Sequence, residues 1–147
     1  MTRKSIKKKP TKMTSSIEYI GGLRTKATHL KSGNSLITDA PTDNQGKGES
    51  FSPTDMVATA LGACMITIMG IRARDNNIDM DGADVAVEKI MASNPRRISE
   101  VRIEIKMPNK DYSPSEIQLL EDAARGCPVC RSLHPDTKVN LRFSWNN

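Results

Sequence analysis

One long apolar segment dominates the hydrophobic pattern of the chain. Residues 56–71 are almost all apolar or small, and a helix that is apolar on every side is buried on every side. Ser52 and Pro53 directly before this segment are typical of an N-cap and a first helical position. We therefore expect a central core helix of about 16 residues, with Cys64 in its middle.

Shorter segments with period-two alternation predict strands on both sides of this helix. The predicted strands are residues 16–23, 24–30, 34–38, 83–92, 98–107 and 139–145. The first three form an antiparallel meander, and residues 39–50 form a loop. A second helix begins with a capping box at Ser113 and stops at Gly126, and a short helix follows Cys127. This order predicts a single α+β domain over residues 16–147.

The positive charge of the chain is concentrated in its first residues. The formal net charge is +5, yet residues 1–12 carry six basic side chains and no acidic one, so the remainder is close to neutral. A nucleic-acid-binding face would combine folded basic charge with aromatic rings, and aromatic residues are only 3% of the chain. We interpret residues 1–15 as a solvated, disordered leader and expect no nucleic-acid partner.

Signals for export and for membranes are weak. No apolar stretch follows the basic leader, as one would in a secretory signal. Residues 56–71 are shorter than the ~20 residues that span a bilayer. Three cysteines are an odd number for a disulfide scaffold and favour a reducing compartment. We expect a cytoplasmic protein without a membrane partner.

The sequence suggests a reactive environment for one cysteine and an unreactive environment for another. Cys127 follows Gly126 and precedes Pro128, which places it at a helix start, where unpaired amide groups stabilise a thiolate. Cys64 lies in the apolar helix, where burial raises the pKa of a thiol. It reacts only if a cation reaches it, and otherwise it serves core packing.

The C-x-x-C motif formed by Cys127 and Cys130 has three interpretations. A thioredoxin-like motif would follow the first strand of a βαβ unit, whereas this one follows a helix near the C-terminus. A zinc site needs about four ligands, and beyond this pair the chain offers Cys64, His29 and His134. In the third interpretation Cys127 acts as the partner thiol of Cys64, and Cys130 has no role in the chemistry.

Three short segments of the chain carry characteristic motifs. Residues 48–64 (GESFSPTDMVATALGAC) combine a Ser-Pro start with an Ala/Gly-rich helix that carries a cysteine, residues 127–129 read CPV, and residues 21–24 read GGLR. Together they resemble the OsmC/Ohr family of osmotically inducible and organic hydroperoxide resistance proteins, namely its Ser/Asn-Pro signature with a reactive cysteine, the segment with its second cysteine, and its glycine-arginine segment. The motif sequences are closer to the OsmC-like branch than to the Ohr branch.

The resemblance implies an OsmC-like fold, in which antiparallel sheets wrap around a long buried central helix in an intertwined homodimer. It implies an active site at the dimer interface, with Cys64 as the peroxidatic thiol and Cys127 as the resolving thiol. Arg24 would stabilise the Cys64 thiolate and polarise the peroxide, which suits an arginine because its charge persists at any ordinary pH. The implied partners are a small organic hydroperoxide and a dithiol reductant such as a lipoylated protein.

The acidic residue that would orient the Arg24 side chain is not at the position where the family has it. Peroxidases of the family have a Glu directly after the proline at the helix start, where this chain has Thr54. Asp55 is the nearest substitute, and the same residue also suits a capping box. Glu49 in the preceding loop is the other candidate, with a solvated loop acid as its alternative role.

Three functional hypotheses remain open at this point. The leading one is a cysteine-based peroxidase of organic hydroperoxides, with hydrogen peroxide as a further substrate and no metal or cofactor. The alternative is a non-enzymatic OsmC-like protein that binds a small apolar or electrophilic ligand at the dimer interface. The third is a small zinc or redox-sensing protein that uses the C-x-x-C motif.

Overall fold

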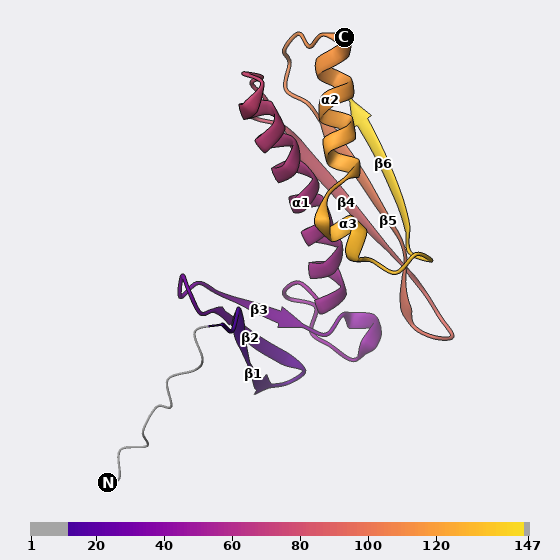
Figure 1. Ribbon diagram of the computed structural model, residues 1–147. Coiled ribbons are helices and arrows are strands. Elements are labelled where there is room, and N and C mark those ends of the chain that lie inside the picture. The colour runs from indigo at the N-terminus through magenta and orange to yellow at the C-terminus, as the bar shows by residue number, and fades with distance from the viewer. Residues whose placement is uncertain (1–11, 146–147) are drawn as a thin grey trace. The chain divides into compact units, whose positions relative to one another are not determined.

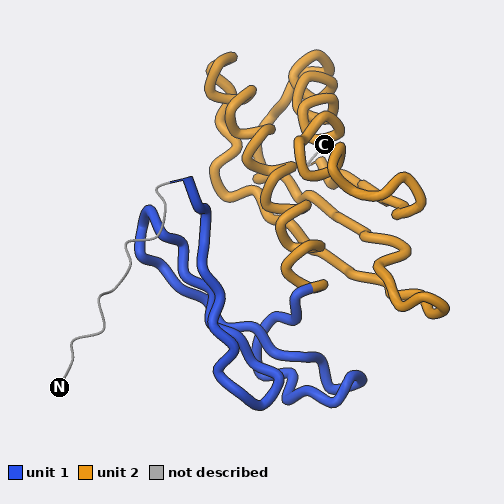
Figure 2. Tube along the Cα trace, turned by 60° about the horizontal axis from the view of Figure 1, so that its bottom comes forward, with its two compact units in different colours: residues 1–53 blue, residues 54–147 orange. Residues whose placement is uncertain are grey.

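A computed structural model describes residues 12–145 of the chain and has the predicted α+β composition (Figure 1). The chain divides into two compact units, an N-terminal unit that ends at Pro53 and a C-terminal unit that begins at Thr54 (Figure 2). Most of the predicted leader, residues 1–11, lies outside the described residues. A single domain over residues 16–147 stays a prediction.

The N-terminal unit is an antiparallel meander in the order β1-β2-β3. Its elements are β1 (Ser15–Gly21), β2 (Arg24–His29), β3 (Ser35–Asp39) and the short 3-10 helix η1 (Thr42–Asn44). The strands agree with the predicted ones. The turn between β1 and β2 is tight because Gly21 and Gly22 both have positive φ (87° and 62°), which glycine adopts without steric cost.

The predicted central helix is α1 (Pro53–Asp75), whose 23 residues exceed the predicted 16. Arg72, Arg74 and Asp75 extend it beyond the apolar segment. By length and hydropathy alone α1 could cross a membrane, which corrects the expectation that no segment is long enough. The core helix of a soluble protein meets the same criteria, and α1 packs against a sheet.

The C-terminal unit contains a second sheet in the order β4-β5-β6. The predicted strands β4 (Asp84–Ala92) and β5 (Arg97–Lys106) pair as an antiparallel hairpin, but β6 (Lys138–Ser144) runs parallel to β5. The sheet of this unit is therefore mixed, which differs from the predicted antiparallel sheets in this one strand pair. A parallel pair requires a long crossover, and α2 (Pro114–Arg125) and α3 (Pro128–Ser132) supply it.

The core of the C-terminal unit lies between this sheet and the helices α1 and α2 (Figure 1). Alternate residues of β5, such as Val101 and Ile103, point to one face of the sheet. They are buried together with Leu61 and Met65 of α1 and Leu120 of α2, and none of the five is more than 1% exposed. The core is aliphatic and rich in methionine.

Only one face of α1 is buried in the single chain. Its buried residues recur at helical spacing: Ala58, Leu61, Gly62, Met65, Met69 and Ala73. By contrast, Val57 and Ile71 of the same helix are 39% and 45% exposed. The prediction of a helix buried on all sides is thus wrong for one chain, because an apolar pattern does not say what covers each face.

The sequence signals around α2 and α3 are confirmed. Ser113 Oγ accepts a hydrogen bond from Glu116 N–H, and Glu116 Oε2 accepts one from Ser113 N–H, both at 3.2 Å, which is a capping box. Gly126 ends α2, and Cys127 follows at once as the N-cap of α3, with Pro128 in the first turn. The position of Cys127 is therefore tied to the end of α2.

Gly62 allows α1 to lie close to the sheet, and its replacement should destabilise the fold. A Cβ at this position would be 2.8 Å from Val87 Cγ2 and 3.2 Å from Val85 Cγ1. Branched side chains such as these have little rotamer freedom to move away. We expect Gly62→Ala to lower the free energy of unfolding by about 1–3 kcal/mol, measured by urea denaturation.

Gly70→Ala in the same helix is the matched control. A Cβ at Gly70 meets nothing within 4 Å, and alanine is favoured over glycine inside a helix by about 1 kcal/mol. This variant should be at least as stable as the wild type. Equal unfolding midpoints for the Gly62 and Gly70 variants would contradict the close packing at Gly62.

Candidate functional site

All three cysteines gather in one place within the C-terminal unit. Cys64 lies in the middle of α1, Cys127 is the N-cap of α3, and Cys130 lies one turn further along α3. The Cys64 thiol lies close enough to Cys127 to raise the pKa of the Cys127 thiol. Cys127 is 0% exposed, Cys64 and Cys130 are half-buried, and all three are free thiols. The fold thus brings together two cysteines that are far apart in sequence.

Burial dominates the electrostatics of Cys127. It raises the pKa of the Cys127 thiol above the ordinary value, because the charged form loses its hydration. The Cys130 N–H donates to Cys127 Sγ at 3.3 Å and lowers the pKa, while the nearby Cys64 and Cys130 thiols raise it again. The predicted helix start is present, but the expectation of a stabilised thiolate at Cys127 is wrong, because burial outweighs one amide hydrogen bond.

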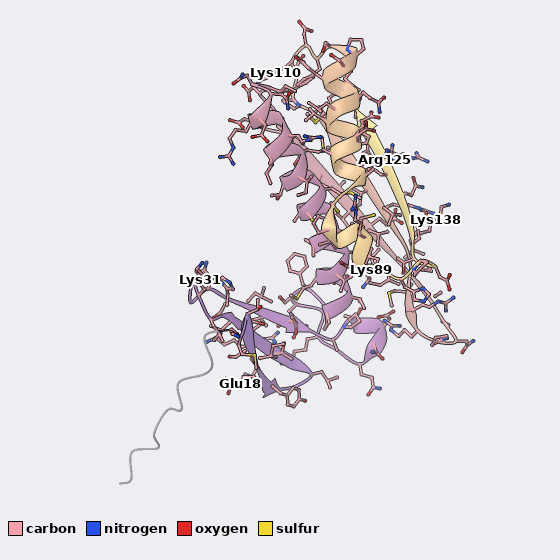
Figure 3. The ribbon with its side chains drawn as sticks, viewed as in Figure 1. Glu18, Lys31, Lys89, Lys110, Arg125 and Lys138 are labelled. Atoms are coloured by element: carbon pink, nitrogen blue, oxygen red, sulfur yellow. The ribbon has the colours of Figure 1, made fainter. Side chains whose placement is uncertain are left out.

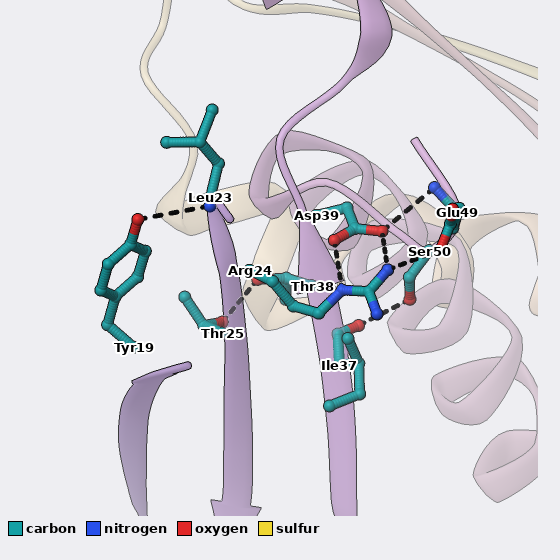
Figure 4. Close-up of polar contacts among 9 residues, drawn as sticks. All are labelled: Tyr19, Leu23, Arg24, Thr25, Ile37, Thr38, Asp39, Glu49 and Ser50. Atoms are coloured by element: carbon teal, nitrogen blue, oxygen red, sulfur yellow. Dashed lines mark hydrogen bonds and ion pairs between the residues drawn. The ribbon is translucent and has the colours of Figure 1, made fainter. Parts of the chain in front are cut away.

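Arg24 is the centre of a polar network in the N-terminal unit (Figure 4). Its Nε donates to Asp39 Oδ1 at 2.7 Å and its Nη2 donates to Asp39 Oδ2 at 2.9 Å, which is a bidentate pair. Nη2 also donates to Glu49 Oε2 at 2.8 Å, and the Glu49 N–H donates to Asp39 Oδ2 at 3.1 Å. Two carboxylates therefore fix the orientation of one guanidinium.

Asp39 is the member of this network that the sequence analysis missed. Its side chain is fully buried, and the hydrogen bonds from Arg24 lower the pKa of the carboxyl despite the opposing effect of burial. Arg24 and Asp39 are directly opposite each other in the β2–β3 pairing. Opposite charges at such cross-strand positions stabilise a sheet, so the register of the hairpin is the signal that could have identified Asp39.

The two acids that the sequence offered as partners of Arg24 have different contacts. Glu49 contacts Arg24 from a loop, where its side chain is 65% exposed. Asp55, in the first turn of α1, pairs at 2.7 Å with Lys89 of β4, and Lys89 is labelled in Figure 3. Lys89 Nζ also donates to Thr54 Oγ1 at 2.8 Å. Asp55 thus links the start of α1 to the sheet within the C-terminal unit.

Other features of the C-terminal unit offer less chemistry than the cysteines. A cavity of about 550 Å³ opens on the sheet, and its lining includes Glu88, Arg102, Glu104 and Arg142 but none of the cysteines. Its mixed charges do not suit an apolar molecule. Among residues 12–145, no group of three or more His, Cys, Asp or Glu side chains is placed to hold a metal ion.

Comparison with known proteins identifies the family. A family model described as OsmC-like protein matches residues 46–142, a range that contains all three cysteines and Glu49. The chain therefore belongs to the OsmC-like family. No curated protein sequence matches the chain.

Solved structures share the fold along almost the whole chain. A protein of Psychrobacter arcticus 273-4, provisionally named an osmotic stress-induced and detoxification response protein, is 49% identical, with a TM-score of 0.86 over 90% of this chain and 96% of that chain. An organic hydroperoxide resistance protein OsmC from Legionella pneumophila is 17% identical, with a TM-score of 0.71 over 92% of this chain and 100% of that chain. One from Elizabethkingia anophelis is 19% identical, with a TM-score of 0.65 over 92% and 97%. The predicted OsmC-like fold is confirmed.

Removal of the Asp39 charge should destabilise the protein in a pH-dependent way. Because the pKa of Asp39 is lowered in the folded state, its ion pair stabilises the fold above the ordinary carboxyl pKa of about 4. That stabilisation is lost as the pH falls through the lower folded pKa. We expect Asp39→Asn to unfold at lower urea concentration than the wild type at pH 7, with a difference that shrinks below about pH 4.

Urea denaturation at a series of pH values measures this difference. Glu49→Gln is the comparison at pH 7, and its effect should be smaller because Glu49 is exposed and accepts one hydrogen bond from Arg24. A loss of stability in Asp39→Asn that stays the same down to about pH 2 would show that the carboxylate charge is not what stabilises the unit.

Cys127 should be the slowest cysteine to react in the folded, reduced protein. The thiolate is the nucleophile. The Cys127 thiol is fully buried and its pKa is raised, so little of it is present as thiolate. We expect iodoacetamide at pH 7 to label Cys64 and Cys130 first, and all three at similar rates in urea. Peptide fragmentation by mass spectrometry distinguishes Cys127 from Cys130. Faster native labelling of Cys127 than of Cys130 would be inconsistent with its burial.

Proposed function

We propose that this protein is a thiol-dependent peroxidase that reduces organic hydroperoxides, with hydrogen peroxide as a further substrate. The observation that carries the proposal is the proximity of Cys64, on α1, to Cys127, at the start of α3. Cys64 packs against the core cluster that contains Cys127, and its thiol raises the pKa of Cys127. Two neighbouring thiols need little movement to form a disulfide. A disulfide between them is the product that a two-cysteine peroxidase cycle requires.

The proposed cycle has two chemical steps. The Cys64 thiolate attacks one oxygen of the hydroperoxide, the O–O bond breaks, the alcohol leaves with a proton, and Cys64 becomes a sulfenic acid. The Cys127 thiol then attacks the Cys64 sulfur, an S–S bond forms, the S–O bond breaks, and water leaves. An external dithiol, such as a lipoylated protein, reduces the disulfide.

Arg24 provides the cation in this proposal. A thiol among apolar side chains needs a fixed positive charge to become a thiolate. Asp39 and Glu49 hold the Arg24 guanidinium in place by accepting three hydrogen bonds from it, and the family resemblance is what assigns this cation to the Cys64 thiolate. We assign Asp39 and Glu49 the role of orienting Arg24, whereas Asp55 pairs with Lys89.

We further propose that the protein acts as a homodimer. Within residues 12–145, all fully buried apolar side chains belong to the C-terminal unit. The N-terminal sheet instead exposes Ile17, Tyr19 and Leu36, which are 69%, 66% and 45% exposed. Apolar surface of this kind, together with the exposed Val57 and Ile71 of α1, suits burial against a second copy of the chain.

The named relatives support the substrate class. Proteins with this fold from Legionella pneumophila and Elizabethkingia anophelis are described as organic hydroperoxide resistance proteins. The three free cysteines support a reducing compartment, for which we propose the cytoplasm.

Substitution of the two cysteines tests the mechanism. Reduced protein is mixed with one equivalent of cumene hydroperoxide or hydrogen peroxide, and the remaining peroxide and the protein mass are followed. We expect Cys64→Ser to consume the organic peroxide about 1,000-fold more slowly than the wild type. Cys127→Ser should consume the first equivalent at the wild-type rate and accumulate a Cys64 sulfenic acid, which dimedone traps.

Thr67→Ser, one turn from Cys64 on α1, is the matched control and should keep the wild-type rate. Unchanged peroxide consumption in Cys64→Ser would mean that the mechanism is wrong. If neither peroxide oxidises Cys64 in the wild type, the peroxidase proposal fails. A non-enzymatic protein that binds a small apolar or electrophilic ligand then becomes the better description of the fold.

A further inference from the structure

We propose that Cys130 accepts the disulfide formed between Cys64 and Cys127, so that Cys127 and Cys130 become the redox pair that faces the reductant. This inference rests on the proposed peroxidase function and adds a third cysteine to its cycle. The disulfide would then move from the Cys64–Cys127 pair to the Cys127–Cys130 pair.

The local geometry of Cys127 and Cys130 suits a disulfide. They lie three residues apart at the start of α3, and the Cys130 N–H donates to Cys127 Sγ at 3.3 Å. The Cys127 side chain therefore lies back over the first turn of the helix, beside Cys130. A Cys-x-x-Cys pair at a helix start is the arrangement of reversible dithiol sites.

Location distinguishes the two possible exits for the oxidising equivalent. Cys127 is 0% exposed, while Cys64 and Cys130 are both half-buried and both pack against the core. Thiol–disulfide exchange needs direct access to one of the two sulfurs. Transfer to Cys130 moves the accessible sulfur from the middle of α1, where the peroxide reacts, to the short helix α3 beside the exposed Arg131. The hydroperoxide and the reductant then react with different cysteines.

The transfer is an internal thiol–disulfide exchange. The Cys130 thiol loses its proton to solvent and attacks Cys127 Sγ, the Cys127–Cys130 bond forms, the Cys64–Cys127 bond breaks, and Cys64 leaves as a thiolate. One disulfide replaces another, so the step needs no oxidant beyond the hydroperoxide. Cys64 is then able to reduce a second hydroperoxide before any reductant arrives.

Tryptic peptides distinguish the two disulfides. Cys127 and Cys130 share peptide 126–131, whereas Cys64 lies in peptide 48–72. A Cys64–Cys127 disulfide cross-links these peptides, but a Cys127–Cys130 disulfide leaves peptide 126–131 alone and lighter by two hydrogen atoms. Reduced protein is treated with one equivalent of cumene hydroperoxide, quenched in acid at successive times, alkylated with iodoacetamide and digested.

In the wild type we expect the cross-link to rise and then decay while the internal disulfide appears and Cys64 becomes open to alkylation again. In Cys130→Ser the cross-link should persist. Without any reductant, the wild type should consume about two equivalents of peroxide per chain and Cys130→Ser about one. The second equivalent should leave a Cys64 sulfenic acid that dimedone traps.

Cys130→Ala is the second variant and should behave as Cys130→Ser with unchanged circular dichroism, so that a folding defect is not mistaken for loss of the thiol. A wild-type cross-link that persists as long as in these variants overturns the relay. A wild-type cross-link from Cys64 to Cys130 also overturns it, because Cys130 then resolves Cys64 directly. If Cys64 stays reduced in the wild type and in every variant, the peroxidase proposal itself fails. That result is distinguishable from failure of the relay, in which the cross-link forms but persists.

Discussion

The close approach of α1 to its sheet is the constraint on which the cysteine site depends. Gly62 leaves room for Val85 and Val87, so one face of the helix lies against β4 and β5. Cys64 falls between the buried Leu61 and Met65 on that helix, at the border of the buried face. The end of α2 rests on the same core, and Cys127 follows it directly. The proximity of two thiols that are distant in sequence is therefore a consequence of core packing.

The N-terminal unit is organised by charge rather than by an apolar core. Over residues 12–53, the buried residues are polar: Thr38, Asp39 and Ser52. A buried carboxylate is tolerated only with hydrogen-bonding partners of opposite charge, and Arg24 provides one with bidentate geometry. The same contacts leave the guanidinium with few orientations. Stability of the sheet and orientation of the cation thus follow from one ion pair.

Local signals made much of this structure predictable from sequence. The capping box at Ser113, the stop at Gly126 and the proline after Cys127 each act within one helical turn, and each is where the sequence puts it. The long-range features were not predictable in this way. The parallel pairing of β6 depends on where a crossover ends, and the one-sided burial of α1 depends on what covers each face.

The candidate site shows the same division between local and long-range information. The family resemblance selected Cys64, Cys127, Arg24 and Glu49 from short motifs. Asp39 has no motif of its own, because it is defined by the pairing of two strands. The pKa of Cys127 was predicted in the wrong direction because the helix start is local, whereas the burial that outweighs it comes from the tertiary fold.

Burial and reactivity oppose each other at a thiol, and the three cysteines differ in this balance. A peroxidatic thiol must meet peroxide, and an exit thiol must meet the reductant, so each needs access to solvent. Cys127 has none, and its raised pKa keeps it a thiol. It is therefore protected from direct oxidation by peroxide, yet it lies close to both Cys64 and Cys130. A buried thiol in that position is suited to exchange disulfides with its neighbours and to little else.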